Sequence, residues 1–364
     1  MRKQVVTPAI ALLMLLPCGY HASHAADNAV DEDWPAIENC LGIIRGCQMP
    51  DGMIRMKGGN SPVWTVPYFG NLAAMALLAA NDRRQNAQDA IRVERWLIWY
   101  ARNQEADGTI FDLEGTVQSY KSNGKRDATD SYAATFLMAT WRYAKAVGQH
   151  PSPDIVDAAK KALTVIDAVV QNDGLTIAKP EYPIKYLMDN IEVYQGLTEG
   201  ALFFGSVGLA EQSRKAEQMA LRVAGSLGKY WSEEDHVFAF ALDMKDKASS
   251  GLTQSYPHGL AQLFALSYMS PARPELWTRV RHTFTPGDEG VPIERWLIAA
   301  EENAEEEVLG EIRRATRNAA LRFAAEDVYL ERPAMAVIAL LGVEARFPCV
   351  PSSPGQDGPR RSGH

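Results

Sequence analysis

Cysteine is scarce in this chain of 364 residues, which holds only four. Their spacing matches no metal site. Cys18 falls in a leader-like N-terminus, and the remaining three cannot all pair within one chain. Cys40 and Cys47 are about 10 Å apart along a continuous helix, too far for a disulfide. A bond from either of them to Cys349, or buried free thiols, are the alternatives.

Positive charge is also in deficit. Lysine and arginine number 37 against 45 aspartates and glutamates, and the formal net charge is −8. No basic stripe with interleaved aromatic residues occurs. Because phosphate contacts need clustered Lys and Arg, we expect no nucleic-acid partner.

Several catalytic signatures are missing. The seven histidines form no H-E-x-x-H or other metal spacing. The sequence has neither a glycine-rich phosphate loop nor a G-x-S-x-G elbow. Metal, nucleotide and serine-hydrolase mechanisms therefore find no support, and we expect no cofactor.

Long apolar runs are absent except near the N-terminus. Arg2 and Lys3 precede the apolar stretch Val5–Leu16, and small residues suitable for cleavage lie near Ala25. We interpret residues 1–25 as a signal peptide, whose removal leaves a charge of −8 − 2 = −10. We expect an exported protein, periplasmic or secreted, with no membrane span after cleavage. The tail, residues 351–364, has no apolar residues to bury and is expected to be disordered.

Helical periodicity dominates the rest of the chain, and the connectors repeat. Three connectors place Asp-Gly, a tight-turn signal, after a helix and before a short apolar run. They are Cys47–Met56, Asn103–Asp112 and Val170–Lys179, with a looser copy at Trp231–Asp243. They recur roughly every 55 to 65 residues, the length of two helices and two connectors.

An unusually apolar helix follows each connector, and more polar, amphipathic helices lie between these. The apolar segments are Pro67–Ala80, Asp130–Ala144, Asp189–Gly205 and Tyr256–Met269, with Glu331–Gly342 as a late member. The pentapeptide ERWLI occurs at Glu94–Ile98 and Glu294–Ile298, and we assign both copies to amphipathic outer helices. Helices that are apolar all round are buried, whereas those with one apolar stripe lie outside. The alternation predicts an all-α toroid of helical hairpins with short β-like connectors. A straight solenoid is the alternative, but its two layers would be more alike in polarity.

These hairpins, connectors and acidic helix starts resemble the six-hairpin glycosidase-like superfamily from about Asp33 to Phe347. The segments TDSYAATF (Thr129–Phe136) and MDNIEVYQGL (Met188–Leu197) are distantly similar to the aspartate-bearing inner-helix starts of unsaturated glucuronyl hydrolases. The chain departs from those enzymes in lacking the rest of their D-x-M-M-N-L stretch and their other pocket motifs. The resemblance implies that residues 33–347 form a single domain, an (α/α)6 toroid in which the inner-helix N-termini surround one funnel.

The helix starts that would line this funnel carry acids and aromatics. Carboxylates and amides bind sugar hydroxyls, and aromatic faces stack on sugar rings, so we expect a carbohydrate substrate. We predict Asp130 and Asp189 as the catalytic residues. The predicted substrate-binding residues are Trp64, Tyr68, Asp127, Tyr132, Asn190, Glu192, Tyr194, Tyr256 and His258.

Glycoside hydrolysis needs two carboxyl groups, one as acid and the other as nucleophile or base. A helix N-terminus favours the charged form of an acid, so a proton donor there needs an apolar pocket or a neighbouring carboxylate. Asp189 and Glu192 also resemble a capping box, and Asp130 is a favoured N-cap. A helix cap is therefore the alternative role for each acid.

The expected function is an exported glycoside hydrolase. A polysaccharide lyase on the same toroid is an alternative, with Tyr256 or His258 as its base. A non-catalytic sugar-binding or polysaccharide-export accessory protein is another.

Overall fold

The computed structural model describes residues 24–59, 62–148, 151–269, 273–288 and 290–342, with side chains from Val30 onward. Most of the predicted signal peptide, the predicted tail and Cys349 lie outside these residues. None of the helices in the described part is both long enough and apolar enough to cross a membrane. Cys40 and Cys47 are fully buried free thiols in the first helix.

The described residues form twelve α-helices arranged as six hairpins. The outer helices are α1 (His24–Cys47), α3 (Ala87–Asn103), α5 (Pro153–Val169), α7 (Ala210–Ser226), α9 (Pro274–Thr283) and α11 (Glu306–Leu321). The inner helices are α2 (Pro67–Arg83), α4 (Asp130–Val147), α6 (Leu187–Ser206), α8 (Leu260–Tyr268), α10 (Ile293–Asn303) and α12 (Glu331–Leu341).

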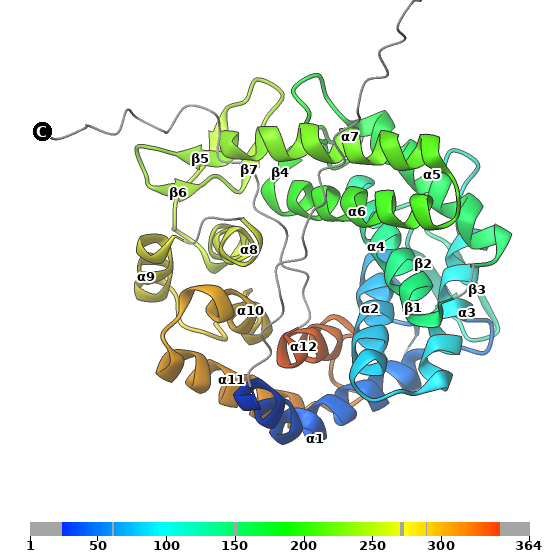
Figure 1. The fold of residues 1–364 in the computed structure, drawn as a ribbon, viewed down its shortest axis with the longest axis horizontal. Helices are drawn as coiled ribbons and strands as arrows, with labels where there is room; N and C mark the ends of the chain where they lie inside the picture. The colour runs from blue at the N-terminus through cyan, green and yellow to red at the C-terminus, as the bar shows by residue number, and fades with distance from the viewer. Residues whose placement is uncertain (1–23, 60–61, 149–150, 270–272, 289, 343–364) are drawn as a thin grey trace, which may run out of the picture.

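The inner helices close into a ring. Each packs against the next in chain order, and α12 packs against α2, while the odd-numbered helices surround them (Figure 1). On α11, Arg313 closes the ring: it donates to Asp33 Oδ2 of α1 and to the Leu340 carbonyl of α12, each at 2.6 Å. The predicted all-α toroid is confirmed.

One expectation about the layers was wrong. The first ERWLI copy lies in outer helix α3, but the second begins inner helix α10, which packs between α8 and α12. Its polar residues are buried because they have partners: Glu294 is fully buried and accepts hydrogen bonds from Arg332 on α12. Amphipathic periodicity therefore assigned this segment to the wrong layer.

Small residues allow the inner helices α4 and α6 to approach closely. A Cβ added to Gly196 on α6 would lie 2.5 Å from the carbonyl oxygen of Ala134 on α4. Further along the same interface, Arg142 of α4 makes a two-oxygen ion pair with the buried Glu199 of α6. These contacts fix α6, whose N-terminal turn carries Asp189, against α4.

The three Asp-Gly connectors have the same structure. In each, the aspartate Oδ1 accepts the N–H of the residue two positions on, at 2.9–3.2 Å. Each glycine takes positive φ, where a side chain would be strained, and a Cβ on it would clash with a carbonyl of the next outer helix. The three pairs are Gly52 with Arg95 of α3, Gly108 with Lys161 of α5, and Gly174 with Arg222 of α7.

Short antiparallel strands join the connectors at the inner-helix starts. One sheet has the order β1 (Val63–Thr65), β2 (Leu113–Thr116), β3 (Ser119–Ser122). A second has the order β4 (Lys185–Tyr186), β7 (Ala241–Leu242), β8 (Ala248–Ser249), and β5 (Trp231–Ser232) pairs with β6 (Val237–Phe238). The looser fourth connector forms this β5–β6 hairpin. A π-helical turn, η2 (Ser255–Gly259), leads into α8 and contains a cis Tyr256–Pro257 peptide.

Candidate active site

The starts of the inner helices converge on one site. Tyr68 of α2, Asp130 of α4, Asp189 and Glu192 of α6, Arg295 of α10 and Glu331 of α12 interact electrostatically with one another. Tyr256 of η2 interacts in the same way with Asp127, Asp189 and Glu331. We call Asp127, Asp130, Asp189 and Glu192 the acid cluster. The ring therefore brings together side chains that are up to 263 positions apart, from Tyr68 to Glu331.

Asp130 is the first residue of α4 and has no exposed surface. The hydroxyl of Thr176 donates to its Oδ2 at 2.6 Å, and the Ser131 N–H donates to its Oδ1 at 2.9 Å. Burial raises the pKa of Asp130 to about 7, and these two hydrogen bonds oppose the rise. The carboxyl is therefore held in one orientation and is poised to exchange a proton near neutral pH.

Asp189 lies in the first turn of α6 and is half-buried. Its Oδ2 is enclosed and has no hydrogen-bond partner among the described residues. Burial raises the pKa of Asp189 well above its usual value, and the charges of Asp130, Glu192 and Asp127 raise it further. These effects outweigh the helix N-terminus, which favours the charged form. Burial and the neighbouring acids therefore favour the protonated form of Asp189.

Glu192 lies one turn after Asp189 and is buried. The Tyr68 hydroxyl donates to its Oε1 at 2.5 Å. Burial raises the pKa of Glu192 to about 7, while the Tyr68 hydrogen bond and the charge of Arg295 lower it. Arg295 itself is buried, stacks on the Phe264 ring at 4.1 Å and donates to the Tyr268 hydroxyl.

Asp127 differs from the other three acids because it is exposed. Its backbone N–H donates to the Tyr132 hydroxyl at 3.4 Å, and that hydroxyl donates to Asp112 Oδ1 at 3.0 Å. Tyr132 itself is buried, and burial raises the pKa of Asp112 to about 6. Tyr132 therefore supports the segment that presents Asp127.

Asn190 is fully buried and joins the third connector to α6. Its Oδ1 accepts the Thr176 N–H at 2.8 Å. Its Nδ2 donates to the carbonyls of Thr176 and Tyr186 and to the Tyr230 hydroxyl. Because Thr176 also holds Asp130, Asn190 fixes the connector that orients this acid.

Most of the remaining predicted site residues lie at the rim. Trp64 in β1 and Tyr256 in η2 are exposed, at 39% and 59%. His258 packs edge-on against Phe240 at 4.9 Å, and burial lowers its pKa. Tyr194 lies half-buried in the second turn of α6.

Three residues that contribute to the site were not predicted: Thr176, Arg295 and Glu331. Glu331 opens α12, so the helix-start rule that singled out Asp130 applied to it as well. Arg295 was missed because its helix was assigned to the outer layer. Thr176 lies in a connector and has no sequence signal of its own.

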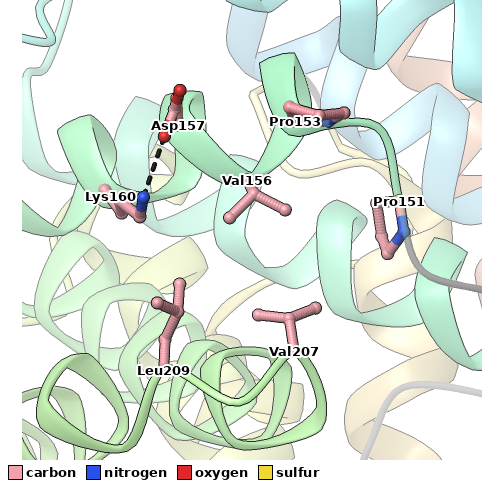
Figure 2. A pocket seen from close by; sticks show the side chains of 7 residues that line it. All are labelled: Pro151, Pro153, Val156, Asp157, Lys160, Val207 and Leu209. Atoms are coloured by element: carbon pink, nitrogen blue, oxygen red, sulfur yellow. Dashed lines mark hydrogen bonds and ion pairs between the residues drawn. The ribbon is translucent and has the colours of Figure 1, made fainter.

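A surface hollow of about 410 Å³ lies away from this site (Figure 2). Its lining residues are Pro151, Pro153, Val156, Asp157, Lys160, Val207 and Leu209. Val207 follows the last turn of α6, about 27 Å along that helix from Asp189. The hollow is therefore separate from the acid cluster. Within the described residues, no group of three or more His, Cys, Asp or Glu side chains is arranged to hold a metal ion.

No protein-family profile and no curated protein matches the sequence. Solved structures do match its fold. A metal-independent α-mannosidase from Streptococcus pneumoniae has a TM-score of 0.57 at 12% identity, covering 88% of this chain and 98% of its own. A β-1,3-1,4-glucanase from Paenibacillus sp. X4 has a TM-score of 0.56 at 12% identity, covering 90% and 95%. An unsaturated glucuronyl hydrolase from Bacillus sp. GL1 matches over 56% of this chain and 58% of its own, with a TM-score of 0.41 at 15% identity.

The first two of these structures have TM-scores above 0.5 and share the toroid fold of this chain, so the predicted resemblance is confirmed for the fold alone. The acid cluster lies where the inner helices of this toroid begin.

Proposed function

We propose that this protein is a glycoside hydrolase in which Asp189 is the proton donor. The observation that carries the proposal is the enclosed, unpaired Oδ2 of Asp189 beside three other acids. Such surroundings raise the pKa of a carboxyl group and favour the protonated form that general-acid catalysis requires. The glycosidase fold of the structural neighbours supports the same class of reaction.

The second carboxyl group of this proposal is Asp127. It is exposed, and it interacts electrostatically with Asp189. Asp189 gives its proton to the glycosidic oxygen as the bond to the anomeric carbon breaks. Asp127 acts as nucleophile or accepts a proton from the attacking water.

Asp130 is a positioning residue in this scheme. It has no exposed surface, so it acts through its charge on Asp189 rather than through contact with the sugar. Tyr256, Trp64 and Tyr68 would bind the substrate. Export is part of the same proposal and rests on the leader-like residues 1–25.

The test is a panel of soluble polysaccharides incubated with purified protein, read by new reducing ends. For the substrate that is cleaved, Asp189→Asn and Asp127→Asn should each lower kcat by about 10²-fold or more. Asp154→Asn, at an exposed position on α5, is the matched control and should be unchanged.

Products that absorb in the ultraviolet would contradict hydrolysis and indicate a lyase, with His258 or Tyr256 as its base. Full activity of Asp189→Asn would remove Asp189 as proton donor. Binding without new reducing ends would favour a carbohydrate-binding or export accessory protein.

A further inference from the structure

The exposed aromatic side chains have an uneven distribution. Among the described residues, the exposed large aromatics are Trp64, Tyr182, Tyr256 and Tyr329. All four lie in segments that lead into an inner helix, namely α2, α6, α8 and α12. Of the exposed aliphatic side chains, Ile91 and Leu221 lie on outer helices, and Leu202 lies near the end of α6, far from its start. The aromatic surface is therefore concentrated around the site.

Two of these aromatics form one cluster, which we call the α12/α2 platform. The rings of Trp64 and Tyr329 meet edge to face, with centroids 5.9 Å apart. The Lys57 ammonium lies 5.1 Å from the Tyr329 ring. The Met56 N–H donates to the Trp64 carbonyl and the Leu330 N–H to the Met56 carbonyl, each at 2.8 Å. The platform is therefore held by backbone hydrogen bonds.

The other two aromatics belong to a second cluster, the α6/α8 platform, made of Tyr182, Tyr186, Phe240, Tyr256 and His258. Tyr186 stacks on Phe240 with centroids 6.5 Å apart, and Phe240 contacts the His258 ring at 4.9 Å. The hydroxyls of Tyr182 and Tyr186 are 3.5 Å apart. Tyr256 interacts electrostatically with Tyr186.

The ring order puts the two platforms on opposite sides. In the sequence α2, α4, α6, α8, α10, α12, the pair α12/α2 is separated from the pair α6/α8 by α4 on one side and by α10 on the other (Figure 1). Asp130 opens α4 and Arg295 lies in the first turn of α10. Tyr256 of one platform interacts with Asp189 and with Glu331 of α12. In ring order, Asp127 and Asp130 at the start of α4 therefore lie between the platforms, and Asp189 and Glu192 on α6 lie beside the second platform.

We propose that the two platforms bind a linear glycan with sugar units on both sides of Asp189, so that the protein cuts internal bonds. The inference rests on the proposed function. Tyrosine and tryptophan combine a large apolar face with a polar group, which suits a sugar ring that has apolar faces and polar edges. An enzyme that removes terminal sugars needs aromatic contacts on only one side of its proton donor, whereas the present site has aromatic platforms on two sides.

Binding is tested first, with Asp189→Asn as the turnover-deficient background. Native gels are cast with soluble starch, mixed-linkage β-glucan, α-mannan or xylan, and retardation gives the affinity. Trp64→Ala and Tyr182→Ala should each weaken retardation by one of these glycans about tenfold, the loss typical of truncating an aromatic anchor. Leu221→Ala, at an exposed position on α7, should have no effect. No retardation in any gel, or sensitivity to one platform alone, would overturn the proposal.

Product analysis then tests the position of cleavage. Wild type acting on the retarding glycan should release a spread of oligosaccharides early, and viscosity should fall faster than reducing ends appear. Release of only the terminal unit would overturn the inference and leave the proposed function standing. Unimpaired turnover by Asp189→Asn would instead remove the proposed proton donor, whatever the two platforms bind.

Discussion

Thr176 donates its hydroxyl to Oδ2 of Asp130 at 2.6 Å, although 46 positions separate the two residues. The bond links the third connector to the start of α4. Both side chains are fully buried, so water does not compete for either oxygen. The orientation of Asp130 therefore depends on a connector that belongs to the next hairpin.

Thr176→Val should raise the pKa of Asp130, because the lost hydrogen bond favours the charged form. If ionised Asp130 supports turnover, the acidic limb of the pH–activity profile moves to higher pH. Leaving a buried oxygen unpaired should cost about 1–3 kcal/mol of unfolding free energy, measured by urea denaturation. Thr176→Ser keeps the hydroxyl and should keep the wild-type limb. An unmoved limb in Thr176→Val would show that Asp130 does not control it.

Glu192→Gln should move the alkaline limb of the profile to lower pH. Ionised Glu192 raises the pKa of Asp189, so a neutral glutamine lets Asp189 lose its proton earlier. Tyr68→Phe removes a hydrogen bond that lowers the pKa of Glu192, and should shift the limb in the same direction by less. Glu211→Gln on the exposed side of α7 is the control. A shift to higher pH would contradict the proposed charge on Glu192.

Asp189→Asn should stabilise the protein in a pH-dependent way. The folded pKa of Asp189 lies above its unfolded value of about 3.9, so the folded state binds the extra proton. Wild-type stability is then lost as pH rises from about 4 through the raised pKa, and the variant avoids this loss. The Tm of the variant should match wild type near pH 4 and exceed it at pH 8. A constant difference across this range would mean that Asp189 does not bind the extra proton.

Gly196→Ala should destabilise the fold, because the new Cβ would meet the Ala134 backbone at 2.5 Å and push α6 away from α4. Overpacking of this kind costs about 1–3 kcal/mol. Gly225→Ala on α7 is the matched control, since its Cβ has open space. That variant should gain up to about 1 kcal/mol from helix propensity. Urea denaturation of both variants checks the pair, and equal effects would contradict the close contact between α4 and α6.

Much of the fold could be predicted because it depends on local pattern. The apolar runs around Asp130 and Asp189 indicate buried helices, and Asp-Gly marks each regular connector. The layer of α10 could not be predicted, because Glu294 is buried only through its pairing with Arg332, 38 positions away. Periodicity contains no information about such a partner.

The candidate site, like the fold, could be predicted from the sequence only in part. Helix starts are visible in the sequence, so Asp130, Asp189 and Glu192 could be selected. The raised pKa of Asp189 could not be predicted, because it depends on burial and on the charges of Asp130 and Asp127, which the packing of α4 against α6 brings close. Arg295 and Glu331 come from the last two hairpins, and their effect on Glu192 and Tyr68 has no local signal.

The close contact of each connector glycine with the next outer helix affects how the protein unfolds. Gly52, Gly108 and Gly174 each pack the connector within one hairpin against the outer helix of the following hairpin. A hairpin therefore cannot open without releasing the turn that precedes it, and Arg313 joins the last hairpins to the first. Repeat arrays with free ends fray from those ends, but in this closed ring every hairpin packs against two neighbours. Its denaturation should be cooperative, with all six hairpins lost in one transition.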